Sequence, residues 1–361
     1  MGKNIVVFSD GTGQKGGEGV STNVYQLFTF VEDRTPRQIA FYDPGLGTDW
    51  KKITGNAFGL GFSRNLKQCY QFIFDNFESG DQIYLFGFSR GAATVRSLAS
   101  FINRFGILPK SRPDLIKEAY RLYKNRATNH GEMKIEAFRE KHNSMKSKIA
   151  FLGVWDTVAA LGFPHKGPDV LLDRLFKHDF HNFDLSENVE FARQALAIDD
   201  ERKTFHPILW SKINNDTQKR IKQVWFAGVH TDIGGGYPEQ GLSDISLNWM
   251  IDEATEKGLI IYNKSDKYAK FIGEKTDNSN DMMHDEQTGW LGKIYRRARR
   301  EWKQNGVKRE EKPLIHESVL SRTKNQHNKD TPPYTPWIIE GLSENKYETE
   351  KWNISKPISE I

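Results

Sequence analysis

One serine of this chain has the surroundings of a catalytic nucleophile. Ser89 lies between Gly87 and Gly91, directly after the apolar run 83–86 and before a helical pattern of apolar residues. Where a strand turns sharply into a helix at a serine, the serine backbone is strained and bulky neighbours would collide, so glycines are required beside it. The N-terminus of the following helix favours the negative charge that forms in acyl transfer. The motif therefore predicts a nucleophile elbow.

A second serine provides an internal comparison. The segment Gly61-Phe62-Ser63-Arg64 repeats most of the motif, but it follows a glycine-rich loop instead of a strand. Ser63 is better interpreted as the N-cap of a helix that runs through Leu66 to Phe74. The sequence context therefore selects Ser89.

A serine nucleophile needs a base to accept its proton and an acid to orient that base. Asp156 and His230 each follow an apolar run and keep the chain order serine, acid, histidine. An alternative set, Ser89 with Asp232 and His316, keeps the same order. The choice of base therefore stays open between the two histidines, and Asp232 is the substitute acid.

Both preferred partners also have a simpler structural interpretation. A lone loop histidine usually bonds to backbone, but His230 precedes three consecutive glycines, 234–236, which imply that some other group approaches the backbone closely. Asp156 is well placed to cap a helix that begins at Thr157. The glycines favour the catalytic interpretation of His230, whereas for Asp156 both interpretations stay open.

The first glycine-rich loop introduces a different class of function. Residues 11–16 match the dinucleotide pattern G-x-G-x-x-G after an apolar run, and Glu32 or Asp33 lies at about the right distance to bind a ribose. The match weakens because Asp10 would place a negative charge against a pyrophosphate and no helix can begin before Asn23. A nucleotide-binding or interaction module on a Rossmann-like sheet is therefore the rival hypothesis.

The same loop has a role in acyl transfer. If it lies beside the nucleophile strand, the backbone N–H groups of Gly11 or Thr12 can form an oxyanion hole together with that of Arg90. Asp10 then belongs to the loop that borders the site.

Five apolar runs end in loops that contain Gly or Asp, and helical patterns separate most of them. The runs are residues 5–8, 38–42, 83–86, 149–154 and 224–227. Continuous apolar strands that alternate with helices indicate an α/β fold, with a mostly parallel sheet covered by helices on both faces. Loops at the carboxyl ends of such strands build the site, and these loops hold most of the candidate residues. The pattern predicts an α/β-hydrolase-like fold.

The domain organisation predicted from the sequence is one domain over residues 1–361. Within it, residues 109–148 are expected to form a charged helical insertion or lid, with helices near 115–123 and 135–142. Residues 163–215 are predicted to be mainly helical, including 191–198, and residues 263–330 to form a polar, basic insertion.

Composition limits the remaining functions. A net charge of +5 suits weak attraction to anionic surfaces such as phospholipid headgroups, but it is too diffuse to indicate nucleic-acid binding. The single cysteine, Cys69, excludes an intrachain disulfide and a cysteine-based zinc site. No segment is long and apolar enough to span a bilayer, and Asp10 interrupts any signal-peptide core. We expect a soluble protein that is synthesised in the cytoplasm.

Six motifs of the chain together resemble the α/β-hydrolase family, formerly a domain of unknown function, that includes the phospholipase effectors of bacterial type VI secretion. The motifs lie in family order at residues 7–12, 42–48, 80–96, 153–158, 195–210 and 228–237. The resemblance implies a triad of Ser89, Asp156 and His230, carboxylester hydrolysis with no metal or organic cofactor, and glycerophospholipid substrates. It also implies possible export by a secretion system, although a member acting on soluble esters would carry the same motifs.

The segment Trp290–Trp302 is a candidate for membrane contact. It places Trp, Leu, Ile and Tyr among basic residues that include Arg296, Arg297, Arg299 and Arg300. An interfacial helix of this composition would dock on anionic lipid. The alternative is a basic surface helix that packs its apolar side on the domain. The sequence points to no protein partner.

Overall fold

The chain is described by a computed structural model. The described residues are 2–11, 19–31, 33–45, 55–126, 129–142, 144–158, 185–211, 220–262, 264–273, 278–286, 297–300, 302, 312–324, 333–340 and 347–352.

The described chain is organised around an eight-stranded sheet in which every neighbouring pair is parallel. The strand order is β2-β1-β3-β4-β5-β6-β7-β8. The strands are β1 (Asn4–Ser9), β2 (Gln38–Asp43), β3 (Gln82–Phe88), β4 (Ile149–Trp155), β5 (Val189–Ala197), β6 (Ile221–Phe226), β7 (Leu314–His316) and β8 (Glu348–Glu350). The prediction of an α/β fold with a parallel sheet is confirmed.

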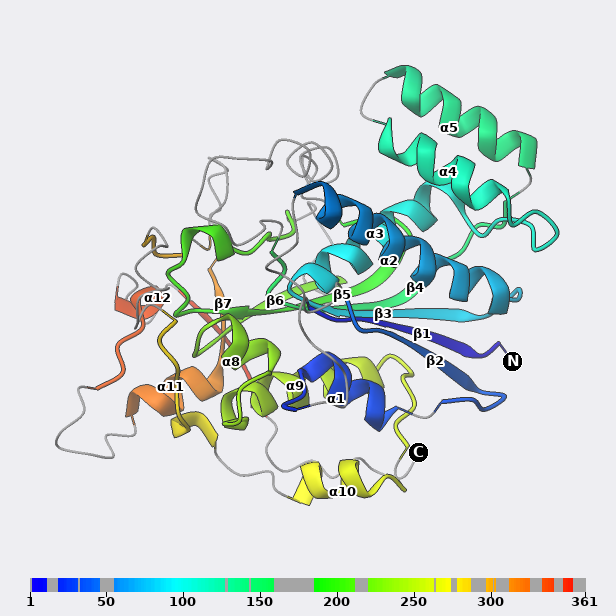
Figure 1. The fold of residues 1–361 in the computed structure, drawn as a ribbon. Coiled ribbons are helices and arrows are strands. Elements are labelled where there is room, and N and C mark those ends of the chain that lie inside the picture. Colours follow the sequence, from blue (N-terminus) through cyan, green and yellow to red (C-terminus); the bar gives the residue numbers. More distant parts are fainter. Residues whose placement is uncertain are drawn as a thin grey trace.

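Helices cover both faces of the sheet (Figure 1). On one face lie α2 and α3, and α4 and α5 pack outside them; on the other lie α1, α9 and α10. The helices are α1 (Asn23–Phe30), α2 (Gly55–Asn76), α3 (Arg90–Phe105), α4 (Leu115–Lys124), α5 (Asn129–His142), α8 (His230–Gly234), α9 (Gly241–Thr255), α10 (Asp266–Gly273), α11 (Glu317–Lys324) and α12 (Trp337–Glu340), with short 3₁₀ turns η2 (Lys203–Phe205) and η3 (Asn278–Asn280).

Burial of both faces explains why the central strands are continuously apolar. All six residues of β1 and all seven of β4 are buried. Their side chains are divided between one core against α2 and α3 and another against α1 and α9. A strand with helices on both sides has no solvent face, so the period-two alternation of polar residues is absent.

The helical prediction for residues 191–198 is wrong, because most of this segment forms β5 in the middle of the sheet. Its sequence, VEFARQALA, contains Ala, Arg, Gln and Glu, which favour helices in isolation. Hydrogen-bonded ladders with β4 on one side and β6 on the other override that local preference.

The N-cap prediction for Ser63 is also wrong. Helix α2 begins at Gly55, so Ser63 lies within it, and its hydroxyl accepts a hydrogen bond from Tyr120 at 2.7 Å. Phe62, which lies between the glycines and Ser63, is buried in the core, and this packing stabilises a helix in spite of the glycines.

The charged segment 109–148 contains α4 and α5, as predicted. These helices pack on the body of the fold: the Tyr123 hydroxyl bonds to the Ser97 carbonyl at 3.1 Å, and Phe138 contacts Phe105. Those contacts lie along α3, away from the end where Ser89 precedes the helix. A lid role for this segment stays a prediction. Strand β7 lies within the predicted insertion 263–330 and pairs with β6 and β8, so this part belongs to the sheet.

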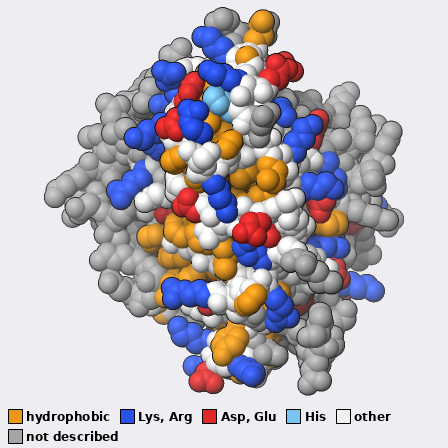
Figure 2. Space-filling view, turned by 90° about the vertical axis from the view of Figure 1, so that its right-hand side faces the viewer, with side chains coloured by type: hydrophobic (Ala, Val, Ile, Leu, Met, Phe, Trp, Pro, Cys, Tyr) orange, Lys and Arg blue, Asp and Glu red, His pale blue; other side chains and the backbone are white. Residues whose placement is uncertain are grey.

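Charged side chains are interspersed on the face that contains the amino ends of the strands (Figure 2). Lys and Arg lie among acidic and apolar groups there, which agrees with a diffuse net charge of +5. Among the described helices, none combines the length and the apolar character that crossing a membrane requires.

Candidate active site

The backbone at Ser89 has the strained geometry expected of an elbow. Ser89 follows β3 directly and has φ 56° and ψ −118°, a region that side-chain-bearing residues rarely occupy. The described non-glycine residues with positive φ are Arg34, Ser89 and Asp156. Two of these three belong to the candidate site, and backbone strain of this kind concentrates at functional sites.

The glycines beside Ser89 are sterically required. A Cβ at Gly91 would collide with the backbone carbonyl of Ser9 on β1, and a Cβ at Gly87 would lie 2.6 Å from the Gly91 carbonyl oxygen. The tight crossing of β1, β3 and α3 therefore accepts glycine only, which confirms the steric interpretation of the motif.

The structure brings Asp156 and His230 together. Asp156 follows β4, His230 begins α8 after β6, and the Nδ1 atom of His230 lies 2.5 Å from Oδ2 of Asp156. Both side chains are buried. A carboxylate only accepts hydrogen bonds, so Nδ1 carries the proton and Nε2 is left as the basic nitrogen.

Two phenylalanines hold the imidazole. The Phe88 ring lies beside the His230 ring with centroids 4.6 Å apart, and Phe205 contacts it edge-on at 5.2 Å. Because Phe88 directly precedes Ser89, it links the elbow to the base. Phe88 also packs against Gly234, where a Cβ would overlap its ring. This contact confirms the close approach that the three glycines predicted.

The Ser89 backbone also lies against the loop of the acid. Its N–H donates to the Trp155 carbonyl at 3.0 Å, one residue before Asp156. The Ser89 hydroxyl does not cap α3, and among the described residues it forms no hydrogen bond with His230. Such bonds often become short only when substrate is bound.

Arg300 binds Asp156, and the sequence did not indicate that it belongs to the site. Its two terminal nitrogens donate to Oδ1 and Oδ2 of Asp156 at 2.6 and 2.9 Å, and both side chains have 0% exposure. Burial alone would raise the pKa of Asp156, but the Arg300 charge and the His230 hydrogen bond together lower it well below its usual value. Arg300 is therefore not exposed for the lipid contact that the membrane hypothesis for residues 290–302 would require of it.

A second acid–base pair supports this arrangement. Asp200, after β5, accepts a hydrogen bond from the backbone N–H of His230 at 3.2 Å and is paired with Arg202 at 2.5 Å. Burial would raise the Asp200 pKa, but the Arg202 hydrogen bond and the charges of Arg300 and Arg202 lower it. Both carboxylates next to His230 are therefore held in the ionised form.

The predicted oxyanion donors are in different situations. Arg90 is the first residue of α3, so its N–H lies in the first turn at the N-terminus of this helix. Gly11 lies beside the elbow, since a Cβ there would be 3.6 Å from Ser89 Cβ, but its N–H donates to its neighbour Asp10 at 2.7 Å. In this structure Gly11 is therefore engaged elsewhere, and Thr12 lies outside the described residues.

Asp10 is a buried carboxylate whose described partners are uncharged. Besides Gly11, the hydroxyls of Thr22 and Tyr42 donate to its Oδ2 at 2.6 and 2.7 Å. Burial raises the pKa of Asp10 to about 6, although these hydrogen bonds oppose the shift. Most of the supposed dinucleotide loop lies outside the described residues, and α1 begins only at Asn23, capped by Thr22.

The alternative base and acid are not brought together. His316 lies on β7, stacks on Phe226 with centroids 4.6 Å apart, and bonds to Ser318 at 2.8 Å. Burial lowers its pKa to about 3, as expected for a neutral core histidine. Asp232 is instead bonded to His284, whose Nδ1 lies 2.7 Å from Oδ1. Nothing in the sequence around His284 singled it out.

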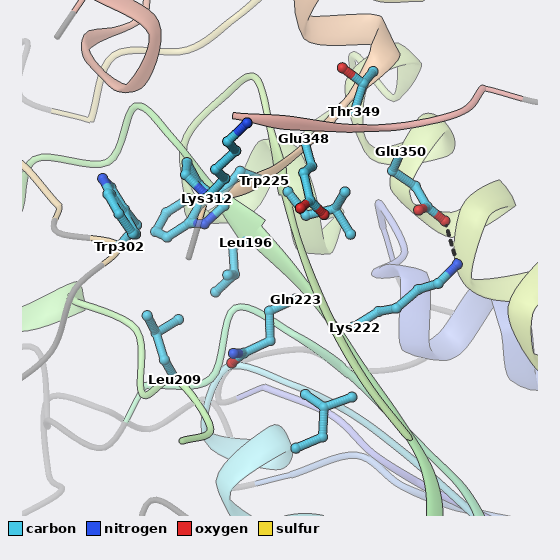
Figure 3. A pocket seen from close by; sticks show the side chains of 13 residues that line it. Leu196, Leu209, Lys222, Gln223, Trp225, Trp302, Lys312, Glu348, Thr349 and Glu350 are labelled. Carbon is cyan, nitrogen blue, oxygen red and sulfur yellow. Dashed lines mark hydrogen bonds and ion pairs between the residues drawn. The ribbon is translucent and has the colours of Figure 1, made fainter. Parts of the chain in front are cut away.

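A separate cavity of about 300 Å³ lies over β5 and β6 and near β7 and β8 (Figure 3). Leu196, Leu209 and Trp225 contribute apolar side chains to it, and Trp302 lies at one end. Ser89, Asp156 and His230 do not line this cavity. Trp302 packs against the apolar cluster there, and most of the predicted membrane segment lies outside the described residues. Among the described residues, no three His, Cys, Asp or Glu side chains are grouped to hold a metal ion.

The chain is similar to a described protein family and to a yeast protein. Residues 3–253 match the family described as "T6SS, phospholipase effector Tle1-like, catalytic domain". A yeast protein from Saccharomyces cerevisiae, uncharacterized protein YEL023C, is 28% identical over 235 residues, which are 58% of this chain and 33% of that protein. The chain thus spans a third of the length of this relative.

Two solved structures are partly similar to this chain. One is an uncharacterized protein from Pseudomonas aeruginosa with a TM-score of 0.43 and 16% identity, covering 72% of this chain and 46% of that one. The other is a butyrate-bound thermophilic esterase from Thermogutta terrifontis with a TM-score of 0.37 and 12% identity, covering 73% of this chain and 86% of that one.

Proposed function

The chain belongs to the Tle1-like phospholipase effector catalytic-domain family, a family of lipase and esterase-type hydrolases, and from this premise we propose that it is a serine hydrolase of carboxylic esters. Ser89 is the nucleophile, His230 the base and Asp156 the acid that orients the base. The observation that carries the proposal is the buried contact of 2.5 Å between His230 Nδ1 and Asp156 Oδ2, next to a strained Ser89.

The proposed reaction has two steps. In the first, Ser89 Oγ bonds to the ester carbonyl carbon while Nε2 of His230 accepts the hydroxyl proton; the bond to the alcohol then breaks as His230 returns that proton to it. In the second, water is activated by the same nitrogen and cleaves the acyl–serine bond, which releases the carboxylic acid and restores Ser89. Asp156 stabilises the imidazolium in both steps because its charge lies against Nδ1.

The developing oxyanion is proposed to bind at the start of α3. The Arg90 N–H belongs to the first turn of this 16-residue helix, where backbone donors and the helix dipole favour negative charge. A second donor from Gly11 requires that its N–H turn away from Asp10, so substrate binding would have to rearrange this loop. Thr12 is a further candidate donor.

The proposed substrate class is glycerophospholipid, by membership of the phospholipase effector family. The alternative is a small soluble ester, which uses the same acyl chemistry. Peripheral contact with a membrane and delivery by a secretion system are proposed on the same family membership.

Labelling with a fluorophosphonate probe tests the nucleophile. We expect wild type and Ser63→Ala to react with the probe and Ser89→Ala to remain unlabelled, because only the elbow serine has a neighbouring base. Ser63 is a matched control, since it lies in a similar sequence motif but within α2. Equal labelling of Ser89→Ala and wild type would overturn the proposal.

The substrate class is tested on lipid and on ester in parallel. Vesicles of bacterial phospholipids are incubated with wild type or Ser89→Ala, and the released fatty acids and lysolipids are measured by mass spectrometry. Release by wild type alone supports phospholipid hydrolysis. Turnover of a short soluble ester with no release from vesicles would favour the esterase alternative.

A further inference from the structure

Arg300 has an environment that surface arginines do not have. Its side chain is fully buried and uses all three nitrogens: besides Asp156, they donate to the carbonyls of Asp200, Ala197 and Phe205 at 2.9, 2.9 and 2.7 Å. Burying a guanidinium costs free energy unless its donors and charge are matched, so this site is built to hold it. Arg300 also lies beyond the residues 3–253 that match the family.

We propose that Arg300 is a positioning residue of the active site, which fixes the Asp156 carboxylate in the orientation that bonds His230 and keeps it negatively charged. The inference rests on the proposed function, because it assigns a role to Arg300 through Asp156 and His230. Arg300 itself touches neither substrate nor reacting atoms in this proposal.

Orientation follows from the geometry of the contact. A planar guanidinium that binds both carboxylate oxygens restricts rotation of the carboxylate about its Cβ–Cγ bond. The same guanidinium is tied to the loop after β5 and to η2, whose Phe205 contacts the His230 ring. Arg300 therefore connects the acid to the segments that surround the base.

Charge is the second part of the role. The charged groups around the pair are Arg300, Asp200 at 4.0 Å from Arg300, Arg202 bonded to Asp200, and Glu286 at 3.1 Å from Arg202. Asp200 and Arg202 largely offset each other, so Arg300 is the cation that balances Asp156. Without it, the buried Asp156–His230 pair would bind a proton more tightly, because one positive charge would be missing beside it.

The pH dependence of hydrolysis tests the charge. The acidic limb of kcat/KM for a short soluble ester reports the protonation of the base in the free enzyme. For Arg300→Gln we expect this limb to move upward by about one pH unit, the size of shift that a neighbouring charge produces. The matched control is Arg299→Gln, an exposed neighbour, which should keep the wild-type limb, kcat and melting temperature. A folded Arg300→Gln protein with the wild-type limb would overturn the inference.

Arg300→Lys separates charge from orientation and decides the matter if Arg300→Gln does not fold. Lysine keeps the charge but cannot bind both oxygens as a planar fork, so we expect the wild-type limb, a KM within about twofold and a kcat lowered about tenfold. A wild-type kcat, or the limb expected for Arg300→Gln, would contradict the inference. The proposed function fails separately, because it is overturned by probe labelling or hydrolysis that persists in Ser89→Ala.

Discussion

Two pairs of histidine and aspartate lie close together in this protein, and they differ in what surrounds the buried carboxylate. Asp156 binds His230 and is neutralised by Arg300, and its pKa is lowered. Asp232 binds His284 without an arginine in its described contacts, and burial raises its pKa in spite of its hydrogen bonds. The residue types are the same, so the environment decides in which direction the pKa of each carboxylate moves.

The histidines differ in their second ring nitrogen. Nε2 of His284 lies 3.4 Å from Glu239, and the ring stacks on Tyr237 with centroids 3.7 Å apart. Nε2 of His230 has no hydrogen-bond partner among the described residues. A base needs one nitrogen held and the other available, and of these two pairs only Asp156–His230 meets both requirements. The Asp232–His284 pair is better suited to holding the start of α8, because Asp232 also accepts the Val229 N–H at 3.0 Å.

Alanine substitution of each histidine gives the largest expected contrast. We expect His230→Ala to lower kcat by about 10⁴-fold or more while the melting temperature stays near that of wild type. His284→Ala should lower the melting temperature and keep kcat within about tenfold, since it removes a structural contact. Ester turnover and thermal unfolding of both variants check this. A folded His230→Ala protein with near wild-type kcat would break the contrast and move the role of the base to another histidine.

Asp10 is a buried carboxylate with no cation among its described hydrogen-bond partners, and it shows how burial then affects the pKa. Its pKa is about 6 in the folded chain against 3.8 as its ordinary value, so the folded state binds more protons between these values. Stability from this group is therefore greatest below pH 3.8 and falls as the pH rises through 6, by roughly 3 kcal/mol over the window.

The measurement is the free energy of unfolding of wild type and Asp10→Asn by urea at several pH values from 4 to 7. We expect the difference between the two proteins to change in favour of Asp10→Asn as the pH rises. If the difference in the free energy of unfolding is constant from pH 4 to 7, Asp10 is ionised throughout this range. Hydrogen bonds from uncharged donors would then be sufficient to stabilise its charge.

His316 extends the comparison to a buried histidine without a carboxylate. Its pKa of about 3, lowered by burial, means that the unfolded chain binds more protons than the folded chain between pH 3 and 6.5. Acidification through this window should therefore destabilise wild type more than His316→Phe, which keeps the stacking on Phe226. Urea unfolding at pH 4.5 and 7 measures this, and ester turnover at pH 7.5 should stay within about twofold. Loss of turnover in a folded His316→Phe protein would instead support His316 as the base.

The local sequence determined the elbow and most of the sheet. Glycines 87 and 91 beside Ser89 predict one kind of turn because their lack of a Cβ is a local requirement, and the crossing with β1 bears it out. Apolar runs of four to six residues predicted strands β1 to β4 and β6 because burial on both faces excludes polar side chains. Ser89, Asp156 and His230 were predicted to follow strands, and they lie after the carboxyl ends of β3, β4 and β6.

Only the tertiary structure decided the partners of those residues. β5 has a helix-favouring sequence and becomes a strand because β4 and β6 pair with it on both sides. Arg299 and Arg300 are adjacent arginines in a basic run, yet one is exposed and the other is buried against Asp156, 144 residues earlier in the chain. A sequence pattern reports local periodicity and composition, whereas the pairing of a buried charge depends on which distant loops the sheet brings to the same edge.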